Sequence, residues 1–284
     1  MRNGIDLHTH STASDGTFTP GALVQKAHDL GLYALALTDH DTVAGLAEAH
    51  EAAKATGMRF VPGVEISVKF DGPGHCHLLG YFFDYRHPRL TETLQALHEA
   101  RANRNKKMIA KLRELGIEIS EEELRALAGD GEIGRPHMAK LLVMKGVVKD
   151  FDEAFEKFLG KGKPAYVPKA LLSPKEALEI IHEAGGLTSL AHPYYLKLPP
   201  EGVRDYVREL KEYGLDAIEA YYTDHDRDYT RFCLELAEEF GLLVSGGSDF
   251  HGDNKPEIAL GTGKGDLFVP PEVYDRLRAA WEGR

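Results

Sequence analysis

Short apolar runs that predict buried strands alternate with helical patterns along most of this chain, and the alternation restricts the folds it can adopt. Each run closes on polar residues, and most are followed by a helix-like stretch such as 20–31 or 43–57. Strands that alternate with helices in this way are typical of a parallel sheet covered by helices, so we predict an α/β fold. The apolar runs are 4–7, 33–38, 59–64, 77–83, 187–191, 217–222 and 242–247.

Two architectures fit seven such units, an open doubly wound sheet and a closed barrel. In a barrel, the carboxyl ends of nearly all strands converge on one face, whereas an open sheet gathers functional residues only near its switch point. Polar residues of the metal-ligand type end nearly every apolar run here. We therefore favour a TIM-like α/β barrel, in a seven-stranded variant.

The block from 99 to 174 interrupts the alternation with helical patterns alone. Because its two ends rejoin between consecutive strand units, we predict a mainly helical insertion over the barrel mouth that caps the substrate. The predicted barrel domain then covers 1–98 and 175–284, and the capping domain covers 99–174. The block holds 15 Lys and Arg against 12 Asp and Glu, whereas the rest of the chain holds 19 against 33. A mildly basic segment thus lies within an acidic protein.

The overall composition argues against several classes of protein. A formal net charge of −11 is unlike that of a protein that coats long nucleic acid, so we expect no long duplex partner. No run approaches the roughly 18 apolar residues of a membrane span, and the start of the chain lacks a signal-peptide pattern, which predicts a cytoplasmic protein without a membrane partner. With two cysteines and no CxxC spacing, any metal must rest on histidines and carboxylates. The oligomeric state stays open.

Candidate metal ligands stand at the ends of nearly all the apolar runs. His8 and His10 lie two residues apart at a strand end, so their side chains point the same way and can share one ion. Nine candidates are too many for one ion, since Zn²⁺ takes about four ligands and Mn²⁺ or Fe²⁺ about six. We predict two or three divalent ions, with Mn, Zn and Fe left unranked. The nine are His8, His10, Asp15, His40, Glu65, His77, His192, Asp249 and His251.

Several neighbouring residues allow a second interpretation. Asp39 and Asp41, in the motif TDHD, fit either a structural role or the role of a carboxylate that orients a ligand histidine. His75 lies beside the turn-forming stretch DGPG, so we favour His77, which directly precedes an apolar run.

Clustered metal ions suit the hydrolysis of either amides or phosphate esters, and the basic insertion favours phosphate. Arg135 in GRPH and Lys163 in GKGKP offer a guanidinium fork and a point charge of the kinds that bind phosphate. The alternative for each is an ordinary solvated surface.

These motifs together resemble the polymerase and histidinol phosphatase (PHP) family: HTH at 8–10, TDHD at 38–41, Glu65, His77, His192 and DFH at 249–251. The resemblance implies a distorted (β/α)7 barrel with a trinuclear metal site. It assigns a first metal to His8, His10, Glu65 and Asp249. A second metal would be held by the bridging Glu65 with His77 and His192, and a third by Asp15, His40 and His251.

Within the family, the insertion resembles that of phosphoesterases that hydrolyse 3′,5′-nucleoside bisphosphates or trim short RNA from its 5′ end. This likeness implies hydrolysis by a metal-bound hydroxide of a small phosphorylated substrate, a nucleotide or a short RNA. Asp249 would act with His192 or His251, one of which protonates the leaving alcohol. The residues implied to contact the substrate phosphates are Arg135, His137, Lys163 and His225.

Three alternatives stay open at this stage. One is a histidinol-phosphate-type or other small-molecule phosphatase. Another is an amidohydrolase-type C–N hydrolase, although that class often bridges its metals with a strand-end Lys and no Lys ends any run here. The last is a PHP module without activity, which serves as a structural or regulatory partner.

Overall fold

The computed structural model describes residues 4–128 and 133–284, which divide into two compact units. The sheet unit comprises Met1–Leu94 and Leu171–Arg284, and the helical unit comprises Gln95–Ala170. These limits fall four residues before the predicted domain boundaries at 98 and 174. That the helical unit lies over a barrel mouth and caps a substrate stays a prediction.

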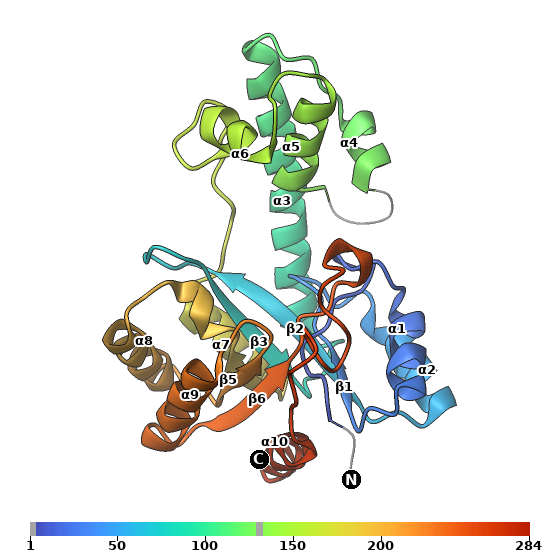
Figure 1. Cartoon of the computed structure of the whole chain (residues 1–284), viewed down its shortest axis with the longest axis vertical. Helices are drawn as coiled ribbons and strands as arrows, with labels where there is room; N and C mark the ends of the chain where they lie inside the picture. The colour runs from blue at the N-terminus through green and yellow to red at the C-terminus, as the bar shows by residue number, and fades with distance from the viewer. Residues whose placement is uncertain (1–3, 129–132) are drawn as a thin grey trace. The chain divides into compact units, whose positions relative to one another are not determined.

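The sheet unit is built on a curled six-stranded sheet whose strands follow one another in chain order, β1-β2-β3-β4-β5-β6 (Figure 1). The pairs β1–β2, β4–β5 and β5–β6 are parallel. The predicted α/β class is therefore confirmed. The strands are β1 (Leu35–Leu37), β2 (Phe60–Val68), β3 (Cys76–Tyr81), β4 (Leu187–Leu190), β5 (Ala217–Tyr222) and β6 (Leu243–Gly247).

Strand β3 departs from the predicted all-parallel arrangement, because it runs antiparallel to both β2 and β4. The physical reason is the connection: a short loop without a helix joins β2 to β3, and a parallel pair would need a long crossover. As a result, the first residues of β3 lie at the edge where the parallel strands end. Register pairs His77 with Ser67, near the end of β2.

The predicted first strand, 4–7, forms one isolated bridge among the described residues, Asp6 with Leu35, and Thr9, just after it, forms another with Phe250. The backbone of 4–7 nevertheless forms hydrogen bonds with the segments on both of its sides. The Asp6 amide donates to the Ala34 carbonyl at 3.1 Å, and the Leu7 amide donates to the Gly246 carbonyl at 3.1 Å. A seven-stranded closed barrel is not confirmed and stays a prediction.

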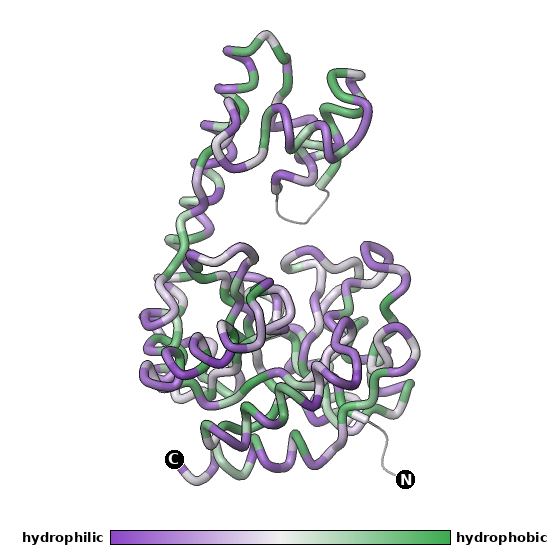
Figure 2. The backbone as a smooth tube through the Cα atoms, turned by 60° about the vertical axis from the view of Figure 1, so that its left-hand side comes forward, coloured by the Kyte–Doolittle hydropathy of each residue, from purple (hydrophilic) through white to green (hydrophobic). Residues whose placement is uncertain are grey.

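Helices pack around this sheet, with α1 and α2 beside β1 and α7, α8 and α9 on the side of β4 and β5 (Figure 1). Strong local signals begin some of them: Ser173 and Glu176 form a reciprocal capping box at the start of α7. Hydropathy alternates along α10, near the C-terminus in Figure 2, as expected of a helix with one face on a core. The helices are α1 (Pro20–Asp29), α2 (Leu46–Thr56), α7 (Pro174–Glu183), α8 (Pro200–Glu212), α9 (Arg227–Glu239) and α10 (Pro271–Glu282).

The helical unit has a hydrophobic core of its own, which includes Met108, Leu112, Leu124, Met138 and Leu142. Helix α3 begins in the sheet unit and continues into the helical unit. Among the described residues, no helix of either unit is long and apolar enough to cross a membrane. The elements are α3 (Pro88–Glu114), α4 (Glu121–Ala128), α5 (Arg135–Met144), α6 (Phe151–Ala154) and the π-helical turn Phe155–Leu159.

Candidate metal centre

Four predicted ligands lie close together at the edge of the sheet where the parallel strands end. His8 and His10 lie on the segment beside β1 and β6, Glu65 lies on β2, and Asp249 follows β6. One ligand atom from each lies within 4.8 Å of the others. Gly247 makes this approach possible, because a Cβ there would lie 2.3 Å from the His8 backbone nitrogen. The glycines of SGGSDFH therefore bring two strands together.

Oxygen and nitrogen atoms in this group lie very close to one another. Glu65 Oε2 is 3.2 Å from Nε2 of both His8 and His10. Asp249 Oδ1 is 3.1 Å from His10 Nε2 and 3.5 Å from His8 Nε2. All four residues are buried. Such convergence of imidazole and carboxylate atoms in a closed space is typical of a metal site.

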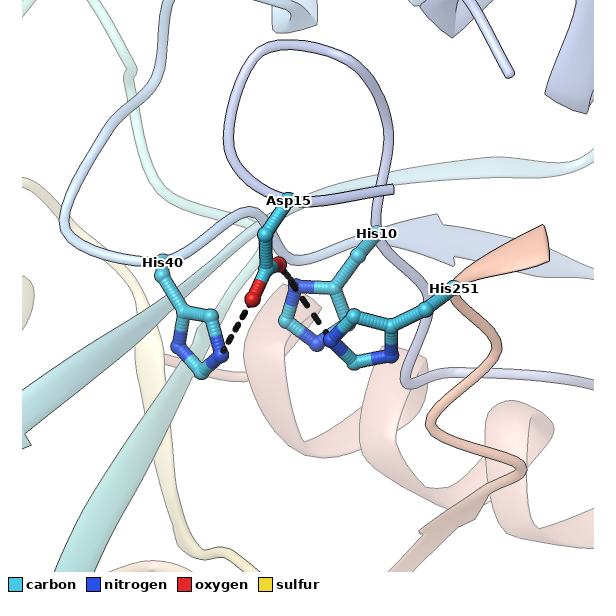
Figure 3. A group of neighbouring side chains, drawn as sticks. All are labelled: His10, Asp15, His40 and His251. Atoms are coloured by element: carbon cyan, nitrogen blue, oxygen red, sulfur yellow. Dashed lines mark ion pairs between the residues drawn. The ribbon is translucent and has the colours of Figure 1, made fainter. Parts of the chain in front are cut away.

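A second group surrounds Asp15, the last residue of interest in the loop after His10 (Figure 3). The Asp15 carboxylate points between two imidazoles, with Oδ1 3.2 Å from His251 Nε2 and Oδ2 3.9 Å from His40 Nε2. The His10 and His251 rings stack at 4.1 Å. His10 thus belongs to both groups, which resemblance alone did not indicate.

The third cluster holds His77 and His192 against the other oxygen of Glu65. Glu65 Oε1 lies 2.7 Å from His77 Nδ1 and 2.8 Å from His192 Nε2. His75 joins these histidines, since ligand atoms of all three lie within 4.8 Å of one another. Sequence reasoning ranked His75 below His77 because of the neighbouring turn, yet the structure brings both to the cluster.

Electrostatics hold the carboxylates of the centre in their charged form. Burial opposes the charge of Glu65, but the imidazoles of His40 and His77 outweigh it and lower its pKa well below the usual value. Burial likewise opposes the charge of Asp249, and His8 and His10 lower its pKa well below the usual value. Burial lowers the pKa of His40 to about 3, so this imidazole is neutral at pH 7. Burial also opposes protonation of His8 and His10, but the carboxylates around them outweigh it, which raises the pKa of His10 to about 9 and that of His8 well above its usual value. Since metals bind charged carboxylates and neutral imidazoles, metal binding at His8 and His10 would release protons.

The centre leaves buried polar atoms without hydrogen bonds. The described structure gives none to His8 Nε2, His10 Nδ1 and Nε2, His40 Nδ1, Glu65 Oε2 or His192 Nδ1. Buried polar atoms without partners are costly, and they are rare unless a water or an ion satisfies them. Because these atoms belong to residues of the groups above, the residues fit divalent metal ions.

Comparison with known proteins places the chain in a family. The PHP domain family matches residues 6–165. The 5′-3′ exoribonuclease of Haemophilus influenzae is 40% identical over 251 residues, which cover 88% of this chain and 91% of that relative. The chain belongs to the PHP domain family. The resemblance predicted from the motifs is thereby confirmed.

Two further proteins match this chain over nearly their whole length. The 3′,5′-nucleoside bisphosphate phosphatase of Chromobacterium violaceum is 37% identical over 279 residues, 98% of this chain and 95% of that relative. The crystal structure of a proposed metal-dependent phosphoesterase from Bifidobacterium adolescentis superposes with a TM-score of 0.81 at 30% identity, and covers 98% of this chain and 96% of its own.

Sequence reasoning missed a buried carboxylate that supports two of the PHP chain's candidate ligands. Glu219, in the middle of β5, is fully buried. Its Oε1 lies 2.9 Å from His8 Nδ1, and its Oε2 accepts a hydrogen bond from the His192 amide at 2.7 Å. The signal was present, because a charge inside the apolar run AIEAYY needs a buried partner.

Two more residues hold Asp249 from outside the predicted set. The Tyr222 hydroxyl and Lys255 Nζ donate to Asp249 Oδ2 at 2.9 and 2.8 Å, so Oδ1 remains for the His8 and His10 side. Asp39 and Asp41 have local structural partners. Asp39 accepts hydrogen bonds from the hydroxyls of Ser11 and Ser14, and Asp41 accepts one from the Ser67 amide.

Backbone conformation at the centre is unusual. Asp41, His192 and Asp249 have φ angles of 54°, 26° and 59°, in a region that residues other than glycine seldom adopt. Such conformations cost about 1–3 kcal/mol each and persist where the surrounding structure enforces them. Here Asp249 is held by its bonds to Tyr222 and Lys255.

The predicted phosphate-contacting residues divide between the two units. His225 lies in the sheet unit, where its Nδ1 donates to the Ala220 carbonyl at 3.0 Å and burial lowers its pKa. His137 accepts the Gly134 amide through Nδ1 at the start of α5, and Lys163 is exposed in a turn. Arg135 begins α5. Their contact with a substrate stays a prediction.

Proposed function

We propose that this protein is a metal-dependent phosphoesterase that hydrolyses phosphate esters of small nucleotides, as a 3′,5′-nucleoside bisphosphate phosphatase or as a 5′-3′ exonuclease on short RNA. The observation that carries this is the set of buried imidazole and carboxylate atoms that converge without hydrogen-bond partners in the described structure. Membership of the PHP domain family and the names of the relatives support the same chemistry.

The proposed centre holds two or three divalent ions, Mn, Zn or Fe, in the ligand sets given by the PHP resemblance. Bound ions of this kind supply a nucleophile at neutral pH and neutralise charge on the phosphoryl oxygens. The geometry that supports the sets is the sharing of Glu65, whose Oε2 faces His8 and His10 and whose Oε1 faces His77 and His192.

The protein's own residues orient the centre and handle the proton. Glu219 fixes the His8 ring through Nδ1, which turns Nε2 toward Glu65 and Asp249. Lys255 and Tyr222 hold one oxygen of Asp249. The leaving alcohol needs a proton, and His192 or His251 is the proposed donor.

Substrate selection is assigned to basic residues. Arg135, His137, Lys163 and His225 are proposed to contact phosphate groups, because guanidinium and ammonium groups bind them well. The mildly basic balance of the helical unit within an acidic chain favours this assignment. The substrate is then a small phosphorylated molecule, and the acidic remainder disfavours long duplexes.

The amidohydrolase alternative lacks its usual bridging group. No Lys ends any of the predicted apolar runs, and Glu65 stands in the position shared between the ligand groups. A purely structural PHP module is disfavoured by the same groups, because all nine predicted ligands are present in them.

A substrate panel tests the proposal. The purified chain, with its metal content measured by elemental analysis, is assayed on adenosine 3′,5′-bisphosphate, a short 5′-phosphorylated RNA, histidinol phosphate and a set of amides. We expect metal-dependent release of phosphate or nucleotide from the first two. Preference for histidinol phosphate or for an amide would overturn the proposed substrate class, and no turnover of any compound with metal bound would overturn the proposed activity.

A further inference from the structure

Tyr194 is an exposed aromatic residue beside the candidate metal ligands. It is the second residue of the 3₁₀ turn Pro193–Leu196, which directly follows the candidate ligand His192 at the end of β4. Tyr194 is 49% exposed. Among the described residues, the other exposed large apolar side chains all lie more than two positions away from any candidate ligand in the sequence. The position of this ring, more than its exposure, therefore suggests a role at the centre.

The turn that carries Tyr194 is held in place by several hydrogen bonds. The Tyr195 amide donates to the His192 carbonyl at 2.9 Å, and the Lys197 amide donates to the Tyr194 carbonyl at 3.2 Å. The Tyr195 hydroxyl donates to Asp224 Oδ2 across the next loop. The backbone of Tyr194 is thus fixed relative to His192, and a ligand that contacts this ring needs little further ordering of the chain.

Neighbouring rings support Tyr194 at steep angles. The Tyr195 ring centre lies 5.6 Å away at 69°, that of Tyr229 on α9 lies 5.6 Å away at 86°, and that of His225 lies 6.5 Å away at 60°. No ring of the described residues stacks parallel on Tyr194. Tyr195 differs, because its ring stacks on His75 with an angle of 21° between the planes. Tyr194 is therefore a supported ring that lacks a stacking partner within the described structure.

The same ring contacts continue from Tyr194 to the metal centre. The His225 ring centre lies 5.2 Å from that of Tyr222, and the Tyr222 hydroxyl donates to the candidate ligand Asp249. All of these residues belong to the sheet unit. A group bound at the metal centre and a group bound on Tyr194 would therefore be neighbours, as the phosphate and the base of one nucleotide are.

We propose that Tyr194 is a stacking platform for the nucleobase of the substrate. Planar bases stack on aromatic side chains, and such stacking tolerates any base because every base has a π face. A base parallel to Tyr194 would supply the stacking partner that the described rings do not. The inference rests on the proposed function, since it takes the substrate to be a nucleotide or a short RNA. It makes Tyr194 a specificity-determining residue that distinguishes nucleotides from other phosphate esters.

A pair of substrates that differ only in the base tests the platform. Adenosine 3′,5′-bisphosphate is compared with methyl β-D-ribofuranoside 3,5-bisphosphate, which keeps the sugar and both phosphates and has a methoxy group in place of the base. Steady-state kinetics are measured for the metal-loaded wild type, Tyr194→Ala and Tyr194→Phe. The matched control is Tyr213→Ala, whose hydroxyl donates to Glu209 and which lies before the start of β5, away from the edge where the parallel strands end.

We expect Tyr194→Ala to raise KM for the adenosine substrate about tenfold, with little change in kcat, and to leave KM for the base-free substrate unchanged. Tyr194→Phe keeps the ring and should stay within about twofold of the wild type, as should Tyr213→Ala. Unchanged KM for the adenosine substrate in Tyr194→Ala would overturn the platform. An equal rise for both substrates would also overturn it, because a disturbed His192 turn would affect them alike. A loss as large in Tyr194→Phe would assign the effect to the hydroxyl and reject stacking.

Folding and metal content are checked by circular dichroism and elemental analysis. Where Tyr194→Ala fails to fold or loses metal, Tyr194→Leu, which keeps apolar volume without a π face, decides by the same criteria.

The platform and the proposed activity fail separately. If the wild type hydrolyses neither substrate, calorimetry compares the binding of adenosine 5′-monophosphate with that of methyl β-D-ribofuranoside 5-phosphate. Tighter binding of the adenosine compound that is lost in Tyr194→Ala would retain the platform and reject the activity, and equal binding of the two by the wild type would reject both. Turnover of adenosine 3′,5′-bisphosphate with equal KM in the wild type and Tyr194→Ala would reject the platform and retain the activity.

Discussion

The two units each hold a cluster of polar side chains whose charges or hydrogen bonds are not balanced within the protein, and the two clusters differ in the sign of the group they could bind. In the sheet unit, buried carboxylates and imidazoles converge with side-chain atoms that lack hydrogen bonds, and Lys255 reaches one oxygen of Asp249. In the described part of the helical unit, Arg104, Lys111 and Arg135 lie against Tyr166 and Val167, and none of the three forms an ion pair with a carboxylate. The first arrangement suits metal cations, and the second suits an anion.

The side chains around Asp216 offer a contrast, because their charges and hydrogen bonds are balanced within the protein. Asp216 accepts hydrogen bonds from the Thr188 amide at 2.8 Å and from His182 Nε2 at 2.8 Å, and it pairs with Arg284. No ligand is needed there, because the protein supplies every partner. Unbalanced charge at the two other clusters therefore points to ligands, whereas balanced charge at Asp216 points to folding stability.

The largest expected effect comes from removal of a carboxylate at the metal centre. Asp249→Ala should reduce turnover by about a thousandfold or more, because several kcal/mol of charge stabilisation by the metals would be lost. Bound metal, measured by elemental analysis, should fall in parallel. Asp253→Ala, an exposed neighbour, is the control. Normal turnover in Asp249→Ala would refute the mechanism.

The next effect concerns Glu219, which acts through His8 and His192. Glu219→Gln should weaken metal affinity by about 10–100-fold, because the carboxylate no longer orients the ligand ring. Titration of metal into the chelated protein measures this. At saturating metal kcat should largely recover, and Glu212→Gln on the exposed face of α8 should bind metal normally. Unchanged affinity in Glu219→Gln would show that the carboxylate only satisfies the buried amide.

A smaller effect is expected for the cationic side of the comparison. Arg135→Ala should raise KM for a bisphosphorylated substrate about tenfold with little change in kcat, because a charged hydrogen bond to a phosphate is lost while the metal centre is intact. Steady-state kinetics with adenosine 3′,5′-bisphosphate measure it, and metal content should not change. Equal KM values in the variant and the wild type would remove Arg135 from substrate binding.

The smallest expected effect is a change in stability at Asp216, whose charge is balanced by its neighbours. Burial opposes the charge of Asp216, but His182 and Thr188 outweigh it and lower its pKa, so the charged form stabilises the fold above the unfolded pKa of about 3.9. That stabilisation is lost as pH falls through the lower folded pKa. Asp216→Asn should cost about 1 kcal/mol of unfolding free energy at pH 7 and much less at pH 3, as measured in urea. Equal losses at both pH values would contradict this, and metal content should not change.

The positions of the candidate ligands could be predicted because strand ends are local features. An apolar run followed by His or Asp is visible in the sequence, and parallel strands bring such ends together. His77 was favoured because it precedes an apolar run, and it does lie near the start of β3; the antiparallel direction of that strand was not predicted. The absence of a helical pattern between 64 and 77 was the available sign of that reversal.

Other features of the site and the fold could not be predicted, because they depend on contacts between segments that are distant in the sequence. Tyr222 and Lys255 bind Asp249 only because the loop after β6 folds back, and no periodic pattern reports such a return. Arg104 resembled any other Arg of a polar helix, although it is buried and donates a hydrogen bond to the distant Val167 carbonyl. The closed seven-stranded barrel was inferred from a count of runs, whereas 4–7 makes a bridge without becoming a strand of the sheet.

The left-handed backbone at Asp41, His192 and Asp249 has a consequence for engineering. Glycine or asparagine would relieve the strain at these positions, so a library screened for heat resistance alone should enrich such replacements. At 192 and 249 each replacement would delete a candidate ligand, and a thermostable variant would emerge without its metals. A screen for robustness in this scaffold therefore has to be coupled to a readout of bound metal.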